Sequence, residues 1–583
     1  MRRKTKKMKY KIQNTDGFNI TMTETKVQEG IIVLHFAADN TDKEAKKLNF
    51  TVRWQIPDIG VHATWGPGKY RDKEVVPNWG SYEKSCAMSL APVYAAVSYD
   101  DRNRQTIACS DGKNTVEIHT GVIEENACLD CVVKIHVDYA VSHYEVDIRI
   151  DSRDLAFYEV IDDVRKWWEG YEGYAPAEVP EAAYLPVYST WYSFHQDIDI
   201  PAIVEECRYF AKLGCKTVIV DDGWQTDNTL RGYDYCGDWR PTHTKVADMK
   251  AFVDAVHETG MKFMLWYSVP YVGLYSEAYS RFQDKMLYKQ GDEDCKTYVV
   301  DPRYPEIREY LIGLYKQAVL DWGLDGFKLD FVDSFVQSDV VKEGMDYISV
   351  YDAVDRLLKD VIKTLRAIKP DILIEFRQSY MGPLMRTFGN MLRCLDCPND
   401  SWTNGMGTLA LRMTSGETAV HSDMVMWNYE ENVELAAFQL TRVLFSVPQI
   451  SVRSSLMNEQ HATMVKRYLE LWTKYRQTLL SGKMLYKGYV NNYPYVSARS
   501  EKVQVGAVYA GRIAYIEVPT EEIVLFNASM DDNILIDAKN AREYLCSVYD
   551  CCGNEVRKER ISLENLLMVK GVPVNGTVIL TAV

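Results

Sequence analysis

The sequence predicts a multidomain α/β protein with a central (β/α)8 TIM barrel, an N-terminal β-sandwich and a small C-terminal β-sheet domain. The chain has 583 residues, more than one hydrophobic core usually serves. Its middle part alternates eight apolar, strand-like segments with helix-like segments, as parallel barrels do. Both flanks alternate apolar and polar residues, which is typical of half-buried strands. We expect domains at 1–175, 176–482 and 483–583.

The N-terminal β-sandwich is predicted from strands that are separated by turn residues. Its clearest alternating segments are 31–38, 48–56, 132–141 and 144–150. Segment 162–183 then predicts a short helix and a linker that contains proline and glycine. Alternation returns at 503–518, which predicts the C-terminal β-domain.

The barrel is predicted from a repeated order of strand and helix. The expected strands are 185–192, 216–224, 262–269, 325–331, 371–378, 390–396, 418–424 and 448–452. Helices are expected at 200–214, 246–260, 303–323, 341–368, 430–446 and 458–478. Active sites of such barrels lie at the C-terminal ends of the strands, so charged residues there are functional candidates.

Composition narrows the possible partners. The net charge of −15 disfavours nucleic acids and anionic membranes, and no apolar run is long enough to span a membrane. The basic segment MRRKTKKMKYK lacks a following apolar run, so we expect a solvated tail and no signal peptide. The 13 cysteines follow no disulfide pattern, which predicts reduced thiols and a cytoplasmic location. The two CLDC segments lie far apart, so no metal or other cofactor is expected.

The segment LDGFKLDFVD places charges at the end of the fourth strand. Alternation puts Lys328 and Asp330 on one face and Phe327 and Leu329 on the other, which must meet the helices. Lys328 and Asp330 are therefore expected to point into the barrel mouth. Other strand ends carry similar groups, namely Asp221, Asp222, Glu375, Arg377, Asp396, His421 and Asp423. Such a ring predicts a polar binding pocket.

Carboxylates across a polar pocket suit glycoside hydrolysis. One carboxylate attacks the anomeric carbon, and the other protonates the leaving oxygen and then activates water. Lys328 would keep Asp330 ionised, which makes Asp330 the first candidate for the nucleophile. The acid needs a raised pKa, and Asp396, Asp400 and Asp423 are all candidates. A structural ion pair is the alternative interpretation of Lys328 and Asp330.

Several motifs together resemble a known family. VIVDDGW at strand two, DGFKLDF at strand four, a late Asp at strand six and DPRYPEIREYL at 301–311 are similar to the retaining α-galactosidases of glycoside hydrolase family 36. The order of β-sandwich, barrel and C-terminal β-domain is also similar. The resemblance implies a retaining α-galactosidase that acts on small oligosaccharides or glycosides by double displacement, and a homo-oligomer.

The resemblance also implies roles for individual residues. Asp330 would be the nucleophile and Asp396 the acid/base, while Asp221 and Asp222 would bind the hydroxyls at C4 and C6 of the sugar. Lys328 would bind nearby hydroxyls and Trp224 would help to wall the pocket. Trp191 and Trp266 could stack on the sugar or simply pack. The full set expected to bind substrate is Asp221, Asp222, Trp224, Lys328, Arg377, Trp191, Trp266, Glu375, His421 and Arg393.

Three stretches depart from the family's pattern. EFRQSYMGP replaces the usual Gly-rich stretch after strand five, LWYSVP lacks the usual Glu-Pro-Glu, and LDCPND replaces Ser-Asp-x-Thr-Asp. An α-N-acetylgalactosaminidase, another α-glycosidase or a transglycosylase of the same clan is therefore an alternative. A metal-dependent lyase with Asp330, Glu375 and Asp396 around Mg²⁺ is an alternative of another class. A catalytically silent carbohydrate-binding protein is a third.

Overall fold

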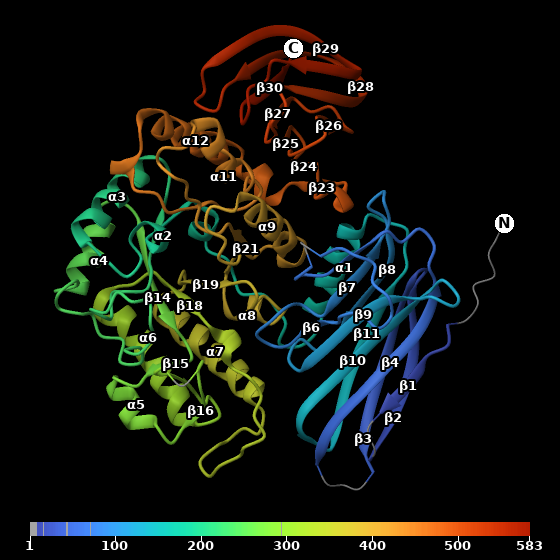
Figure 1. The fold of residues 1–583 in the computed structure, drawn as a ribbon, viewed down its shortest axis with the longest axis vertical. Coiled ribbons are helices and arrows are strands. Elements are labelled where there is room, and N and C mark those ends of the chain that lie inside the picture. Colours follow the sequence, from blue (N-terminus) through green and yellow to red (C-terminus); the bar gives the residue numbers. More distant parts are fainter. Residues whose placement is uncertain (1–7, 15–16, 42–44, 70–71, 293) are drawn as a thin grey trace.

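The computed structural model describes residues 8–14, 17–41, 45–69, 72–292 and 294–583. Two N-terminal sheets are followed by a parallel barrel and a C-terminal sheet (Figure 1). The N-terminal sheets, in blue, lie beside the barrel, and the C-terminal sheet, in red, lies near α12. This arrangement confirms the predicted fold class. The domain boundaries stay predictions, and residues 1–7 of the predicted basic tail lie outside the described residues.

The N-terminal part is a sandwich of two antiparallel sheets, with strand orders β1-β4-β10-β9-β6 and β2-β3-β11-β8-β7-β5. Side chains from both sheets, such as Phe36, Phe50 and Trp54, are buried in one core, because alternate residues of each strand face inward. The strands are β1 (Lys11–Asn14), β2 (Phe18–Gln28), β3 (Ile31–Asn40), β4 (Lys46–Pro57), β5 (Ala63–Trp65), β6 (Glu83–Ser85), β7 (Val93–Val97), β8 (Asn103–Cys109), β9 (Thr115–Ile123), β10 (Cys128–Val141) and β11 (His143–Asp151).

The barrel is one parallel sheet with the order β21-β20-β19-β18-β14-β13-β12-β22. Two parallel bridges, His421 to Val447 and Val425 to Ile450, join its outer strands and nearly close it. The strands are β12 (Val187–Ser189), β13 (Thr217–Val220), β14 (Lys262–Ser268), β18 (Gly326–Asp330), β19 (Leu373–Arg377), β20 (Met391–Arg393), β21 (Ala419–His421) and β22 (Gln449–Ile450). Their C-terminal ends meet at one mouth.

Helix α1 (Phe157–Glu169) connects the sandwich to the barrel. Further helices surround the barrel strands. They are α2 (Trp191–Phe194), α3 (Ile200–Lys212), α4 (Met249–His257), α5 (Glu277–Phe282), α6 (Pro305–Trp322), α7 (Val350–Ile368), α8 (Met385–Phe388), α9 (Ser401–Ser415), α10 (Val433–Ala436), α11 (Phe438–Thr441) and α12 (Glu459–Ser481). A small antiparallel sheet of β15 (Tyr271–Gly273), β16 (Met286–Lys289) and β17 (Thr297–Val300) is inserted after β14.

The C-terminal sheet has the order β23-β24-β25-β27-β30-β28-β26, and β29 pairs with β28. Its strands are β23 (Lys483–Lys487), β24 (Tyr495–Arg499), β25 (Val503–Val508), β26 (Ile513–Ile516), β27 (Glu522–Phe526), β28 (Asn533–Tyr549), β29 (Glu555–Lys570) and β30 (Thr577–Ala582). The carboxylate of Asp101 accepts hydrogen bonds from the amides of Gly488 and Tyr489, both at 2.7 Å. These bonds tie the sandwich to the chain that leaves β23.

The structure differs from the expected elements in several places. The expected helix 341–368 begins only at Val350, and the expected strand 216–224 ends at Val220. The first barrel strand ends at Ser189, so Trp191 begins α2 and does not end a strand. The expected helix 430–446 is divided into α10 and α11. Helix α9 was not expected, because its glycines weaken the helical signal. A side chain at Gly405 or Gly407 would collide with Arg442 or Cys394, so these glycines allow α9 to pack closely.

Candidate active site

Asp330 is the last residue of β18, and its carboxylate lies among four hydrogen-bond donors. Its Oδ1 accepts from Arg377 Nε at 2.8 Å, from the amide of Phe331 at 2.8 Å and from the hydroxyl of Tyr380. Its Oδ2 accepts from Trp266 Nε1 at 3.0 Å. Phe331 has a left-handed backbone with φ of 63°, which ends the strand directly after the carboxylate.

These donors keep Asp330 ionised. Burial would raise the pKa of its carboxyl, but the charges of Arg377 and Lys328 and the hydrogen bonds from Tyr380 and Trp266 hold that pKa well below its usual range. Because the side chain is buried, few of these interactions are screened by water. Asp330 is therefore a buried anion at neutral pH, which is the state that a carboxylate nucleophile needs.

The DDGW turn after β13 brings two more carboxylates to the mouth. Lys328 Nζ donates to Asp221 Oδ2 at 2.6 Å, and both side chains are buried. Asp222 accepts from the side-chain amides of Gln196 at 2.6 Å and Gln225 at 2.7 Å. Burial raises the pKa of Asp222 to about 6, although both amide bonds oppose the rise. The two neighbouring carboxylates thus differ, since Asp221 has a cation and Asp222 has neutral donors.

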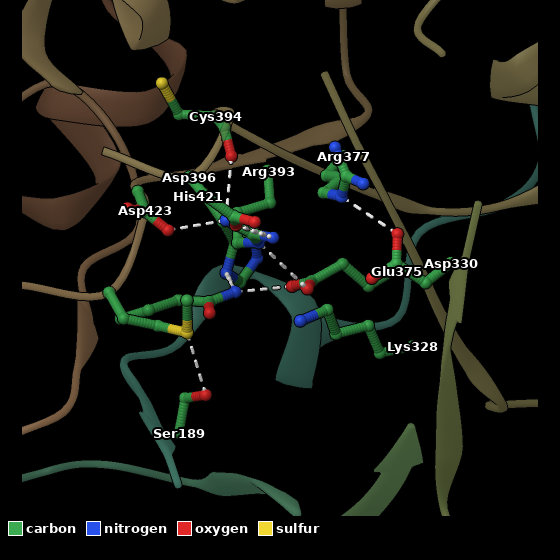
Figure 2. A network of polar contacts seen from close by, with 12 residues as sticks. Ser189, Lys328, Asp330, Glu375, Arg377, Arg393, Cys394, Asp396, His421 and Asp423 are labelled. Carbon is green, nitrogen blue, oxygen red and sulfur yellow. Dashed lines mark hydrogen bonds and ion pairs between the residues drawn. The ribbon is translucent and has the colours of Figure 1, made fainter. Parts of the chain in front are cut away.

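Arg393, at the end of β20, lies at the centre of a second group of carboxylates (Figure 2). Its guanidinium donates to Asp423 Oδ1 at 2.5 Å and to Asp396 Oδ1 at 2.8 Å, and it lies 3.6 Å from Glu375 Oε1. Figure 2 also shows Arg377 reaching Asp330 from the neighbouring strand. Arg377 therefore binds Asp330, while Arg393 on the adjacent strand binds Asp396 and Asp423.

The three candidates for the acid lie in different environments. Asp396 lies on the loop beyond β20, and its side chain is 47% exposed. Asp423 is fully buried and accepts from Arg393, from the Tyr192 hydroxyl and from the Cys397 amide. Asp400 caps the N-terminus of α9 by accepting from the amide of Thr403 at 2.9 Å. Asp396 is therefore the candidate that solvent and a substrate can reach.

The pKa of the acid candidate differs from the expectation. Burial among the other groups raises the pKa of Asp396, but Arg393, Lys328 and Arg377 lower it more, so the net shift is downward. The expected raised pKa is found at Asp423, where burial is the main cause. The charge on Asp330 raises the pKa of Asp396, so the protonation of these two carboxylates depends on one another.

Deeper in the barrel, Glu375 and His421 form an inner polar layer. Gln449 Nε2 donates to Glu375 Oε2 and lies 3.3 Å from His421 Nδ1, while His421 Nε2 lies 2.8 Å from the carbonyl oxygen of Ala183. Burial raises the pKa of Glu375 to about 7 and lowers that of His421 to about 4. Both side chains are fully buried and support the residues of the mouth from below.

The three predicted tryptophans lie in different places. Trp266 is part of the cluster because its indole binds Asp330. Trp224 is fully buried among Trp239, Tyr267 and Trp322, and its Nε1 donates to the carbonyl of Trp266 at 3.0 Å. It is therefore behind Trp266 and does not join the carboxylates. Trp191 lies at the rim, with its ring edge-on to His195.

Four residues of the cluster were missed by sequence reasoning, namely Tyr192, Gln196, Gln225 and Tyr380. All lie in loops or in a one-turn helix, where strand alternation assigns no face. Gly223 has φ of 117°, and a side chain there would collide with the backbone of Gln196. The close approach of these two loops, which the DDGW motif permits, brings Gln196 to Asp222. The only sequence signal for Tyr380 was the departure of EFRQSYMGP from the family's pattern.

Replacing Arg393 with methionine is expected to lower the free energy of unfolding by about 3–5 kcal/mol, because Asp423 and Glu375 would lose their buried cation. Urea unfolding followed by far-UV circular dichroism measures the change. Arg240→Met breaks an exposed ion pair with Glu277 and should leave the unfolding curve nearly unchanged. Equal unfolding midpoints for Arg393→Met and the wild type would contradict this assignment of Arg393.

The described residues contain neither a metal-binding cluster nor a helix that could span a bilayer, and one cavity lies apart from the charged cluster. Among those residues, no group of three or more His, Cys, Asp or Glu side chains is arranged to hold a metal ion. No helix in the same part of the chain combines the length and apolarity needed to cross a bilayer. A cavity of about 830 Å³, lined by Tyr158, Arg412 and Tyr486 among others, shares no residue with the charged cluster.

Part of the barrel sequence is similar to known proteins. The Melibiase family model matches residues 183–382. The chain is 27% identical to α-galactosidase Mel36A of Lactobacillus acidophilus over 201 residues, which is 32% of this chain and 26% of that protein. It is 26% identical to the A type blood α-D-galactosamine galactosaminidase of Flavonifractor plautii over 175 residues, 27% of this chain and 15% of that protein. The matched segment therefore spans only about a quarter or less of these curated relatives.

The similarity in fold to solved structures covers nearly the whole chain. A GH36 α-galactosidase AgaA variant from Geobacillus stearothermophilus, solved with raffinose, superposes with a TM-score of 0.66 at 13% identity. The superposition covers 97% of this chain and 82% of that one. The chain therefore resembles the α-galactosidases of glycoside hydrolase family 36, in sequence across part of the barrel and in fold along almost its whole length.

Proposed function

We propose that the protein is a metal-independent, retaining α-glycosidase, and specifically an α-galactosidase. One observation carries the proposal. Asp330 is a buried carboxylate kept ionised by Arg377, Lys328, Tyr380 and Trp266, and the half-exposed Asp396 lies at the same mouth. An ionised carboxylate together with an accessible second one is what double displacement needs. The likeness to α-galactosidases in sequence and fold supports the same reaction class.

In the first step, Asp330 attacks the anomeric carbon, the bond to the leaving oxygen breaks, and Asp396 gives that oxygen its proton. The charge of Asp330 is lost when the glycosyl ester forms. Because this charge raises the pKa of Asp396, its loss lowers that pKa further and favours the ionised form of Asp396 that acts as a base. In the second step Asp396 takes a proton from water, the water oxygen attacks the anomeric carbon, and Asp330 leaves as a carboxylate.

For the substrate, we propose small α-galactosides. Asp221 and Asp222 offer buried carboxylate oxygens to hydroxyl groups of the bound sugar, and Lys328 offers a donor beside them. Solved proteins of this fold hold raffinose and stachyose, which supports oligosaccharides of this size. The Flavonifractor relative acts on a galactosamine, so an amino-sugar glycoside is the second candidate. Transfer of the glycosyl group to an acceptor sugar, in place of water, is an alternative reaction that assays must distinguish from hydrolysis.

The lyase alternative is less well supported. It requires Asp330, Glu375 and Asp396 to face one metal ion. Asp330 is instead paired with Arg377, while Asp396 is paired with Arg393, which also lies near Glu375. Glu375 is fully buried below the mouth. A Mg²⁺ ion at these carboxylates would have to compete with both guanidinium groups.

A panel of p-nitrophenyl α- and β-glycosides tests the proposal. We expect release of p-nitrophenol from the α-galactoside at the same rate with and without excess EDTA, because no step needs a metal. Turnover of a different α-glycoside would keep the mechanism and change the sugar. Activity that EDTA abolishes would contradict the proposal and favour the lyase.

Two further proposals concern the protein's surroundings. We infer that it works in the cytoplasm, which fits cysteines that are all free in the described chain. We also infer that it forms a homo-oligomer, as the resemblance implies. Both stay predictions.

A further inference from the structure

The two carboxylate oxygens of Asp330 accept different numbers of hydrogen bonds. Oδ1 accepts from Arg377 Nε, from the amide of Phe331 and from the Tyr380 hydroxyl. Among the described residues, Oδ2 accepts a single hydrogen bond, from Trp266. A carboxylate oxygen has two lone pairs in the carboxylate plane, so three donors leave Oδ1 none to share. Oδ2 keeps one free lone pair and is the oxygen that can attack.

We propose that Arg377 and Tyr380 are positioning residues that direct attack to Oδ2 of Asp330 and accelerate breakdown of the glycosyl-enzyme. The inference rests on the proposed function. Both side chains come from the stretch EFRQSYMGP, at the end of β19 and in the loop after it. Tyr380 is fully buried and the Arg377 side chain is 16% exposed, so both contacts are shielded from water. Figure 2 shows Arg377 reaching Asp330, while Arg393 binds Asp396 and Asp423.

The hydrogen bonds from Arg377 and Tyr380 act in opposite directions on the formation and on the breakdown of the glycosyl ester. When the bond between Oδ2 and C1 forms and the bond to the leaving oxygen breaks, Oδ1 becomes the carbonyl oxygen of a neutral ester. Donors to Oδ1 stabilise the free carboxylate more than the transition state, so they do not speed this step. When water attacks C1, the electron pair of the breaking C1–Oδ2 bond returns to the carboxylate. The same donors then stabilise the developing negative charge and speed the step.

This asymmetry predicts a particular kinetic signature. kcat/KM reports steps up to glycosylation, whereas kcat includes deglycosylation. A hydrogen bond to a charged group contributes enough to change a rate about 10- to 100-fold. In Tyr380→Phe we therefore expect kcat and KM to fall together by about 10-fold or more, while kcat/KM changes less than about threefold. The glycosyl-enzyme should accumulate, because its breakdown becomes limiting.

This kinetic signature is tested by stopped-flow kinetics. The substrate is an activated p-nitrophenyl α-glycoside that the wild type hydrolyses. Tyr380→Phe is expected to give a burst of p-nitrophenol of about one equivalent per active site, followed by slow turnover. Arg377→Lys, which keeps the charge but loses the Nε donor to Oδ1, should show the same pattern and serves if Tyr380→Phe does not fold. Tyr188→Phe is the matched control, since it removes a buried hydroxyl that bonds to Ser193 at 3.1 Å.

The outcomes separate the inference from the function on which it rests. A burst with parallel falls in kcat and KM in both variants, and wild-type kinetics in the control, supports the inference. A fall in kcat/KM at unchanged KM, or wild-type kinetics in both variants, would overturn it while the glycosidase stands. If the wild type hydrolyses no α-glycoside at all, the proposed function fails and the inference fails with it.

Discussion

Replacing Asp330 with asparagine is expected to reduce kcat/KM for the α-glycoside by about 10⁴-fold or more, because the amide cannot form the glycosyl ester. Asparagine has nearly the same shape, so the packing around Trp266 and Tyr380 is kept and the loss is chemical. Initial rates with the p-nitrophenyl glycoside measure it, and thermal unfolding of both proteins shows that the variant is folded.

Asp333→Asn is the matched control for this experiment. Asp333 lies three residues further along, in the short 3₁₀ turn Val332–Ser334, and is exposed. Its replacement should leave kcat/KM within about threefold of the wild type, since Asp333 interacts with Arg377 and Asp330 only through their charges and has no part in bond formation or proton transfer. A second check uses Asp330→Gly with sodium azide, which should restore turnover and give the β-glycosyl azide. Wild-type activity in Asp330→Asn would remove Asp330 from the mechanism.

Replacing Asp396 with alanine is expected to have an effect that depends on the leaving group. For an oligosaccharide, whose leaving oxygen needs a proton, we expect kcat/KM to fall by about 10²–10⁴-fold. For a dinitrophenyl glycoside, which leaves without help, the fall in kcat/KM should be much smaller. Because Arg393 and its neighbours lower the pKa of Asp396, the wild type should work best on oligosaccharides at acidic pH, and the variant should lose this pH dependence.

Equivalent replacements distinguish Asp396 from the other candidates for the acid. Asp400→Ala removes a helix cap, so it should reduce stability. Any loss of kcat/KM in this variant should not depend on the leaving group. Asp423→Asn removes a buried partner of Arg393 and should likewise act mainly on stability. If Asp423→Asn, and not Asp396→Ala, shows the dependence on the leaving group, the acid is Asp423 and the assignment of Asp396 is wrong.

The fold could be predicted largely from the sequence because each barrel strand is a short apolar run with its own face pattern. Phe327 and Leu329 pack on the helix side while Lys328 and Asp330 face the mouth, and their alternation alone indicates this. The exact strand ends could not be predicted, since they depend on barrel closure. Ser189 ends the first strand because the chain turns directly into α2 at Trp191.

The candidate site could be predicted only in part. Strand-borne groups such as Asp330 and Arg393 have a face that periodicity assigns, but Tyr380 and Gln196 reach the site from loops. Their positions depend on contacts between distant segments, which leave no local pattern. The acid is expected to have a raised pKa, but the pKa of Asp396 is lowered, because Arg393 is bonded to it and the sequence does not show this bond.

Peptide mass spectrometry of the trapped intermediate tests the central claim most directly. The protein would be incubated with a 5-fluoro-α-galactosyl fluoride, which forms the ester quickly and releases it slowly, and then digested. The account predicts one added fluorohexosyl group on the peptide that contains Asp330, and none on that peptide in Asp330→Asn. An added group on Asp396, Asp423 or Glu375, or hydrolysis of the reagent with inversion at the anomeric carbon, would contradict it.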